Sequence, residues 1–347
     1  VQASIDPQST RLLSFLDVQD NNNVNVGGIV CSNGCQNSLN NTNWTFIIPA
    51  VIPSAISRDT TEAGQTATFT VVLSSQPTDD VTVGISSSDT TEGTVSTGSL
   101  IFTNGNWSTP QTVTVTGIDD FLDDGDIVYS AITAAATSND LNYNGINAMD
   151  VNVTNTDNDS AGITVSLISG NTSEAAVAAT FTVVLNSEPT ADVSLGLSST
   201  DTTEGTVSTE SLTFTNLNWN TPQIVTVTGV DDLTDDGDIA YTLVTAAATS
   251  IDNGYNGINA NDVAALNLDN DSAGVTVSEA SVDVTEGSGN DTYTLVLTSQ
   301  PTADVTLTLG SGGQSSASPS PITFTSANWN TPQTVTVVAI NDAYSEG

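Results

Sequence analysis

The sequence predicts an all-β protein built from tandem antiparallel β-sandwiches joined end to end. The hexapeptide Thr-Phe-Thr-Val-Val-Leu ends at Leu73 and again at Leu185, and its variant Thr-Tyr-Thr-Leu-Val-Leu ends at Leu297, so a unit of 112 residues repeats along the chain. That length suits an independent sandwich of about 100 residues and exceeds one coil of a solenoid. Within each unit, short β-branched runs alternate with Gly, Asn, Asp and Pro turn signals, which is the pattern of short strands.

Seven strands are expected in the first copy, each a run of alternating β-branched residues. They cover 51–57, 66–73, 80–87, 99–103, 111–118, 127–137 and 150–156. An Asn-Trp-x-Thr-Pro-Gln turn precedes the fifth strand. Its Trp, at 107, 219 and 329 in the three copies, is expected to cap the core rather than stack on a sugar. The copies place the domain bounds at 51–161, 162–273 and 274–347, after a non-repeat segment at 1–50.

The chain is acidic because cations are missing. Its 347 residues include 40 Asp and Glu but only Arg11 and Arg58 as cations, with no Lys or His, for a net charge of −38. Without a basic patch, we expect no binding to nucleic acid or to anionic membranes. Without His or Lys there is no His-based triad and no Schiff base. No apolar run approaches the ~18 residues of a membrane-spanning helix, so no membrane insertion is expected.

The two cysteines, Cys31 and Cys35, lie close together in a polar stretch of the non-repeat segment. With two thiols and no His, a zinc site is not expected. The favoured interpretation is a local disulfide that closes a tight turn, which indicates an oxidising, extracellular compartment. Two inert thiols are the alternative.

Each copy carries its acidic residues in three clusters at the ends of predicted strands. They are a Thr-Glu near the start, an Asp-Asp-x-x-Asp-Asp-Gly-Asp loop in the middle and an Asp-Asn-Asp run at the close. A sandwich can bring all three to one tip, where unit charges ~4 Å apart repel by about 1 kcal/mol in water and more inside a protein. Oxygen ligands with Gly turns favour Ca²⁺ over Mg²⁺, so the clusters predict a calcium site. The alternative is that Asp, Asn and Gly are separately solvated turn formers.

The order of these motifs resembles the Calx-beta domain. The shared features are Thr-Glu, the strand Thr-Phe-Thr-Val-Val-Leu with Ser-x-x-Pro after it, then Leu-x-Phe, Thr-Val-Thr-Val-x-Gly-x-Asp-Asp, Asp-Gly-Asp and Asp-Asn-Asp. The resemblance covers about 51–347, as two whole copies and one partial copy. It implies an immunoglobulin-like sandwich with a calcium cluster at one tip, of the kind found in tandem on large bacterial surface and adhesion proteins.

The resemblance also implies which residues bind calcium: the early Glu, the acids of the middle loop and the closing triplet. In the first copy these are Glu62, Asp119, Asp120, Asp124, Asp126, Asp157 and Asp159. In the second copy they are Glu174, Asp231, Asp232, Asp236, Asp238, Asp269 and Asp271. In the third copy they are Glu286, Asp342 and Glu346.

Departures from the family pattern predict fewer or weaker calcium ions. The family's Gly-x-Asp-Tyr segment is missing, since 94–98 runs directly into the next strand, and one ligand is expected to be lost with it. Asn158 and Asn270 stand at the centre of the closing triplet, which removes one negative charge. Asp126 and Asp238 lie one position away from the second acid that the family uses.

The third copy stops inside its acidic loop, because Asn341 and Asp342 align with the paired Asp, and Glu346 with the acid that follows. Its last strands are then missing, which would leave core residues and strand edges bare. Either the polypeptide continues beyond this segment, or another copy of the chain supplies the strands, with residues 1–50 as the expected donor.

These features predict a structural function. Tandem sandwiches stiffened by calcium would form an extracellular stalk, fibre or filament subunit at a microbial cell surface, supporting adhesion, with other copies of the chain or cell-surface ligands as partners. The alternative is a carbohydrate- or protein-binding adhesin whose repeats only extend a binding tip. No enzyme is expected, because the one catalytic constellation that the composition permits is a glycosidase-type carboxylate pair, and an active site does not recur in every unit.

Overall fold

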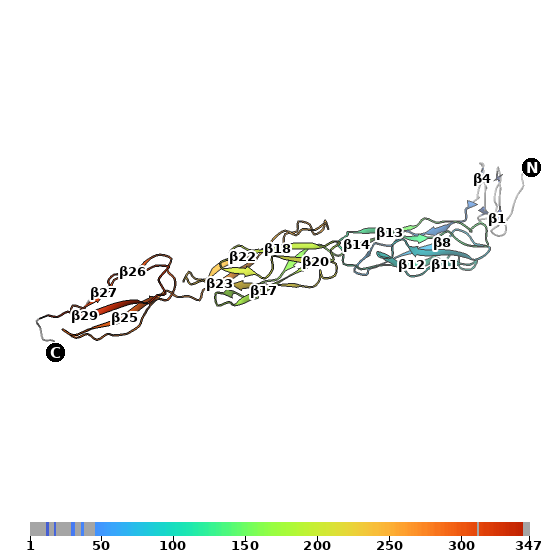
Figure 1. Cartoon of the computed structure of the whole chain (residues 1–347). Coiled ribbons are helices and arrows are strands. Elements are labelled where there is room, and N and C mark those ends of the chain that lie inside the picture. The colour runs from blue at the N-terminus through green and yellow to red at the C-terminus, as the bar shows by residue number, and fades with distance from the viewer. Residues whose placement is uncertain are drawn as a thin grey trace, which may run out of the picture. The chain divides into compact units, whose positions relative to one another are not determined.

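In the computed structural model, all regular structure among the described residues is β-strand (Figure 1). The structure describes residues 46–310 and 312–342 and, before them, only the backbone of four short strands. The chain divides into two compact units, Val1–Ser160 and Ala161–Gly347. No helix that could cross a membrane occurs in the part of the chain that the structure describes. The all-β class that the sequence predicts is therefore confirmed.

Short parallel strands precede the first sandwich. β1 (Leu12–Leu13), β3 (Ile29–Cys31) and β5 (Phe46–Ile47) form one small sheet, and β2 (Asp17–Val18) pairs with β4 (Gln36–Asn37). Cys35 lies outside the described residues, and so does Arg11, so the predicted disulfide between Cys31 and Cys35 stays a prediction.

The first unit contains one sandwich of two sheets. The first sheet has the order β10-β12-β8-β6 and consists of β6 (Val51–Pro53), β8 (Thr66–Leu73), β10 (Gly93–Val95) and β12 (Gln111–Gly117). The second sheet has the order β11-β9-β13-β14-β7 and consists of β7 (Thr60–Thr61), β9 (Val81–Ser87), β11 (Ser99–Phe102), β13 (Ile127–Thr133) and β14 (Val151–Thr156).

Period-two alternation places the apolar side chains between these sheets. Along β8, for example, Ala67, Phe69, Val71 and Leu73 are buried while the Thr and Val residues between them are partly exposed. Trp107 is half-buried and packs against this core, and its carbonyl accepts a hydrogen bond from the Leu73 N–H at 3.1 Å. The packing of Trp107 confirms the role predicted for it from the sequence.

Two strands were not anticipated. β7 is only two residues long and pairs in parallel with β14, at Thr60↔Asn155, and β10 starts with a glycine. Neither has an alternating run long enough to be recognised. The predicted strands over 51–57 and 127–137 are too long, because β6 ends at Pro53 and β13 ends at Thr133.

The second unit contains two hydrophobic cores. The first lies in a sandwich with the same strand order as the sandwich of the first unit. One sheet is β15 (Ile163–Val165), β17 (Ala178–Leu185), β21 (Gln223–Gly229) and β19 (Gly205–Val207). The other is β16 (Thr172–Ser173), β23 (Val263–Leu268), β22 (Ile239–Thr245), β18 (Val193–Ser199) and β20 (Ser211–Phe214).

The last core lies between a four-stranded and a two-stranded sheet. The larger sheet is β24 (Val275–Val277), β25 (Asn290–Leu297), β29 (Gln333–Ala339) and β27 (Ser315–Ser318). β26 (Val305–Leu307) pairs with β28 (Ile322–Phe324) in the smaller one. Phe324 and Val335 are fully buried between them. The chain is thus a tandem series of immunoglobulin-like sandwiches, called repeats 1, 2 and 3 below.

Candidate metal centres

The strand topology brings the acidic clusters of repeat 1 to one end of its sandwich. β14 pairs antiparallel with β13 and parallel with β7, so β14 and β7 both end where β13 begins. The acidic loop 118–126 leads into β13 at that end, Glu62 follows β7, and 157–159 follows β14. β10 pairs with the end of β12, at Gly93↔Gly117, so the residue before it, Glu92, lies at the same tip.

Carboxylate oxygens gather at this tip in two groups of three, within 4.8 Å of one another in each group. The first group is Glu62, Asp119 and Asp159; the second is Glu92, Asp120 and Asp124. Oxygens on opposite sides of a Ca²⁺ lie about 5 Å apart, since each metal–oxygen distance is about 2.3–2.6 Å. Each group therefore has the spacing and the all-oxygen donor set of a hard divalent cation.

The two glutamates of these groups are buried. Glu62 is 3% exposed and Glu92 is 6% exposed, whereas the aspartates that join them are partly or fully exposed. Burial raises the pKa of the Glu62 carboxyl from its ordinary 4.5 to about 7, and the negative charges of Asp157, Asp120 and Asp124 raise it further, against a hydrogen bond from Asn158. Burial also raises the pKa of Glu92, again with help from neighbouring aspartates.

Among the described residues, no basic side chain is positioned to offset this charge. Arg58 is the one cationic side chain within 46–310 and 312–342, and it is exposed. A buried carboxylate without a cation is costly to ionise. At neutral pH the carboxylates at the tip of repeat 1 therefore carry uncompensated negative charge, and a bound cation would neutralise it.

Hydrogen bonds hold the acidic segments in place around the first group. The Asp157 carboxylate accepts the Asp159 N–H at 2.7 Å with one oxygen and the Gly125 N–H at 2.8 Å with the other. It thereby links the closing triplet to the acidic loop. Gly125 adopts a φ of 78°, which glycine tolerates better than any other residue. The Asn158 N–H donates to Glu62 at 3.1 Å, and the Asn158 side-chain amide donates to Asp119 at 3.2 Å. The Asn that replaces an acid in the triplet thus orients two of the carboxylates.

Repeat 2 rebuilds the same tip. Its two groups, with carboxylate oxygens again within 4.8 Å of one another, are Glu174, Asp269 and Asp271, and Glu204, Asp232 and Asp236. Asn270 repeats the bonds of its counterpart, to Glu174 at 3.0 Å and to Asp231 at 3.0 Å. Burial raises the pKa of Glu174 and of Glu204. Backbone hydrogen bonds from Asp271 and Gly237 lower the pKa of Asp269.

Most of the predicted ligands of repeats 1 and 2 meet at these tips. Asp126 and Asp238 do so in a different role, since each accepts the backbone N–H of the first triplet aspartate, at 3.1 and 3.2 Å, and lies outside the groups. Their ligation of calcium stays a prediction. In repeat 3, the Asp342 N–H lies 3.5 Å from a Glu286 oxygen, but among the described residues no group of three forms there. Glu346 lies outside the described residues.

Sequence reasoning missed Glu92 and Glu204. One ligand was expected to be lost with the family's Gly-x-Asp-Tyr segment, yet these glutamates supply a carboxylate to the second group of each repeat. They belong to an Asp-Thr-Thr-Glu-Gly segment that recurs in repeats 1 and 2 and is replaced in repeat 3. That recurrence, together with its loss in repeat 3, was a usable signal.

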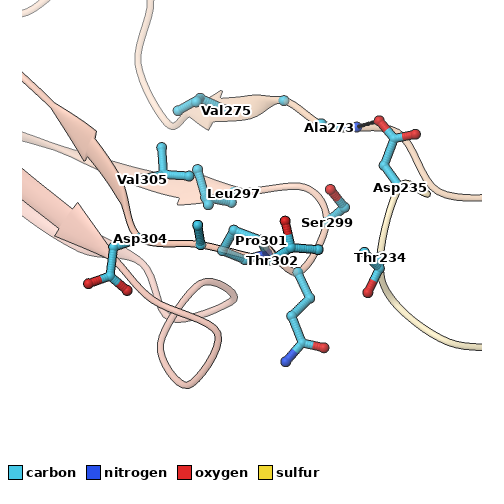
Figure 2. Close-up of a pocket in the computed structure, with 13 residues that line it drawn as sticks. Thr234, Asp235, Ala273, Val275, Leu297, Ser299, Pro301, Thr302, Asp304 and Val305 are labelled. Carbon is cyan, nitrogen blue, oxygen red and sulfur yellow. Dashed lines mark hydrogen bonds between the residues drawn. The ribbon is translucent and has the colours of Figure 1, made fainter.

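The acidic loop of repeat 2 also contacts the start of repeat 3, within the second unit. The Asp235 carboxylate accepts the Ala273 N–H at 2.7 Å, which Figure 2 shows as a dashed line. The Leu233 carbonyl accepts the Gln300 N–H at 2.6 Å. A pocket lies beside these bonds, with Thr234 and Asp235 on one side and Pro301 and Thr302 on the other (Figure 2). The loop that carries Asp232 and Asp236 of the second group is therefore part of the junction.

No protein-family model and no curated protein matches the sequence. Among solved structures, the chain is similar to the CBD12 domains of CALX1.2, with 15% identity over 57% of this chain and 79% of that chain and a TM-score of 0.29. It is similar to the calcium binding domain CBD12 of CALX1.1, with 16% identity, 55% and 77% coverage and a TM-score of 0.28. It is also similar to domains 5–6 of the S-layer protein SbsC, with 14% identity, 64% and 99% coverage and a TM-score of 0.20. At such scores nothing about function follows from the similarity.

Proposed function

We propose that this chain is an extracellular structural protein, a stalk, fibre or filament subunit whose Calx-beta-like sandwiches are stiffened by calcium. One observation carries the proposal: at the tips of repeats 1 and 2, buried glutamates and aspartates converge with no basic side chain among the described residues to balance them. The arrangement occurs at the same tip of both repeats: the second groups match at all three positions, and the first groups match at two, with Asp119 in repeat 1 and Asp269 in repeat 2 as the third members. This recurrence favours a role in the architecture of the array over a single active site.

Calcium fits the donor set better than other cations. Every candidate ligand is a carboxylate oxygen, which excludes the nitrogen and sulfur donors that zinc and copper prefer. The ligands come from irregular loops, which suits the flexible coordination of Ca²⁺ more than the strict octahedron of Mg²⁺. In repeats 1 and 2, one ion would be held by each carboxylate group. A bound ion would supply positive charge and cross-link segments that are distant in sequence.

The contacts at the junction of repeats 2 and 3 support stiffening. An ion held by Asp232 and Asp236 would fix the backbone of their loop, and Leu233 and Asp235 of that loop bond to repeat 3 or the segment before it. Calcium would then restrain the junction as well as the tip. A location outside the cell follows from this proposal, because free calcium is abundant there and scarce in the cytosol.

Thermal unfolding with and without a calcium chelator tests the calcium proposal. We expect chelation to lower the melting temperatures of repeats 1 and 2, and added Ca²⁺ to restore them where Mg²⁺ does not. A matched variant replaces the four buried glutamates Glu62, Glu92, Glu174 and Glu204 with Gln and should no longer respond to calcium. If chelation leaves the unfolding of the native chain unchanged, the carboxylates are solvated turns and the proposal fails.

A further inference from the structure

One buried asparagine contacts the segments that carry both carboxylate groups of repeat 1. The Asn155 side-chain nitrogen donates to a Glu92 carboxylate oxygen at 3.3 Å and to the Ile118 carbonyl at 3.0 Å. Its side-chain oxygen accepts a hydrogen bond from the Thr60 hydroxyl at 3.0 Å. That hydroxyl lies 3.3 Å from the hydroxyl of Tyr129. All four polar side chains in this network are buried.

Each contact of Asn155 lies within two residues of a candidate ligand. Thr60 precedes Glu62 by two positions, and Ile118 precedes Asp119 by one. Glu92 is itself a member of the second group. Asn155 lies two positions before the triplet that begins at 157. A single side chain therefore fixes the relative positions of four segments, which together supply all the members of both groups.

The chemistry of the amide suits this position. Asn155 is fully buried, and it uses both its donor and its acceptor capacity there. An aspartate could not donate to Glu92 and would add a second buried negative charge beside it. An apolar residue of equal size would leave the Ile118 carbonyl and the Thr60 hydroxyl without this partner.

Repeat 2 contains the same network. Asn267 donates to Glu204 at 3.3 Å and to the Val230 carbonyl at 3.0 Å, and it accepts from Thr172 at 3.0 Å. The Thr172 and Tyr241 hydroxyls lie 3.0 Å apart.

Two glycines make room for the network. A Cβ on Gly117 would collide with the Asn155 side-chain oxygen and with the Thr61 carbonyl. A Cβ on Gly93 would collide with the hydroxyl of Tyr129. Gly229 and Gly205 have the same neighbours in repeat 2. The backbone on either side of the network is therefore adapted to it.

Repeat 3 differs at these positions. Its strands pair Ser315 with Ala339 where repeat 1 pairs Gly93 with Gly117, so both glycines are replaced by residues that carry a Cβ. The residue before Ser315 is Gln314, whose carbonyl accepts the Ile340 N–H at 2.9 Å as the Glu92 carbonyl accepts the Ile118 N–H. Repeat 3 therefore lacks both the buried glutamate and the two glycines that make room for the asparagine. Their joint replacement indicates that the glutamate and the asparagine function together.

We propose that Asn155 and Asn267 are positioning residues that couple the two cation positions of their repeats, so that both positions gain or lose affinity together. The proposal rests on the proposed function, because it concerns how the same calcium centres are built. Partners of metal ligands typically change metal affinity 10–100-fold when they are replaced. Here a single replacement should act on both ions.

The test compares Asn155→Leu with Tyr143→Phe in the full chain. The Tyr143 hydroxyl is also buried and bonds to the Ser75 carbonyl at 2.7 Å and the Ser75 N–H at 3.0 Å, but it lies in the β13–β14 loop, at the other end of the sandwich. In calcium titration calorimetry, Asn155→Leu should weaken both positions of repeat 1 by about 10–100-fold. Repeat 2 serves as an internal reference, and Tyr143→Phe should leave all calcium affinities unchanged.

A second readout needs no calcium. In the chelated protein, hydrogen exchange of Asn155→Leu should speed up together in 60–62, 118–126 and 157–159, whereas Tyr143→Phe should affect only residues around Ser75 and around 134–150. If Asn155→Leu does not fold, Thr60→Val removes one bond of the network while keeping the side-chain shape, and it should still lower both affinities several-fold.

The outcomes separate the two proposals. A native chain that binds no calcium defeats the proposed function, and the exchange measurement then still tests whether Asn155 holds the segments together. A native chain that binds calcium while Asn155→Leu weakens only one position, or neither, overturns the coupling alone.

Discussion

The Glu62 carboxyl links the folding of repeat 1 to pH. Its pKa is about 7 in the folded chain without metal and 4.5 ordinarily, so the folded chain keeps a proton over a pH range where the unfolded chain has released it. Stability from this group is fully present below about 4.5 and is lost as the pH rises through about 7. A cation reverses the preference, because it favours the ionised form.

Chelated protein should therefore melt at a lower temperature at pH 8 than at pH 5. The shift from 4.5 to about 7 corresponds to roughly 3 kcal/mol for Glu62. Differential scanning calorimetry across this range provides the measurement. With saturating calcium the decline should disappear, and calcium binding near pH 6 should release protons. Chelated protein that gains stability between pH 5 and pH 8 would contradict this account.

Glu92→Gln should have opposite effects with and without calcium. In chelated protein at pH 8 it removes a buried charge and should raise the melting temperature of repeat 1. With calcium present it removes a ligand, and affinity should fall at least tenfold. Asp89→Asn is the contrast in the same turn, because Asp89 is only partly buried, lies outside both carboxylate groups and has a pKa that is lowered by hydrogen bonds from Thr91. Its charge also acts on Glu92, so its effect should differ between the two conditions in the same direction but far less than that of Glu92→Gln, and calorimetry in both conditions distinguishes the two variants.

Sequence reasoning found the aspartates of the tip more easily than the network behind them. Asp119 and Asp120 stand in a dense acidic loop that recurs, so their pattern alone indicates a charged site. Asn155 lies in β14, whose buried and exposed residues alternate as in any strand of a sandwich. The role of its side chain can be recognised only from the pairing of β14 with β7. A polar residue on the core side of a strand is the one local sign of such a role.

At the scale of elements, alternation predicted the long strands and failed for the short ones. β8, with its alternating Thr and buried apolar residues, coincides with the predicted run at 66–73. β7 consists of Thr60 and Thr61 and exists because β14 lies beside it. Long-range pairing of this kind leaves no periodic signal, although it is β7 that sets Glu62 at the tip.

Gly117→Ala should destabilise repeat 1. The added Cβ would press on the Asn155 side chain and on the Thr61 carbonyl, in β14 and β7 respectively. Overpacking of this kind costs about 1–3 kcal/mol. Gly98→Ala is the matched control, because a Cβ there would meet nothing within 4 Å. The melting temperatures of the two variants are compared by thermal unfolding. Equal melting temperatures would contradict the prediction and show that β12 and β14 can move apart to admit the added Cβ at no cost in stability.

At the scale of the whole molecule, the repeat period predicted the tandem architecture, and the junctions needed the structure. The unit of 112 residues is visible in the sequence, and the described residues contain three hydrophobic cores. The bonds of Leu233 and Asp235 across the second unit could not be foreseen, because they depend on how two folded surfaces meet.

Calcium should protect the amides of that junction from hydrogen exchange. The Ala273 and Gln300 N–H groups bond to the acidic loop of repeat 2, so we expect chelation to speed up their exchange. The Ser278 N–H bonds to the Thr294 carbonyl within repeat 3 and should exchange at the same rate in both conditions. Exchange read by NMR provides the measurement. Equal protection of Ala273 with and without calcium would show that the junction does not depend on the ion.

The close match between repeats 1 and 2 has a consequence for how the chain folds. In β8, Phe69 pairs with Val113 of β12, and in β17, Phe181 pairs with Val225 of β21. A nascent β8 would therefore meet the same register and the same core partners on β21 as on its own β12. Neighbouring modules that resemble each other this closely are prone to exchange strands during folding. Correct assembly then favours completing one module before the next becomes available, as happens when a chain emerges gradually from its N-terminus.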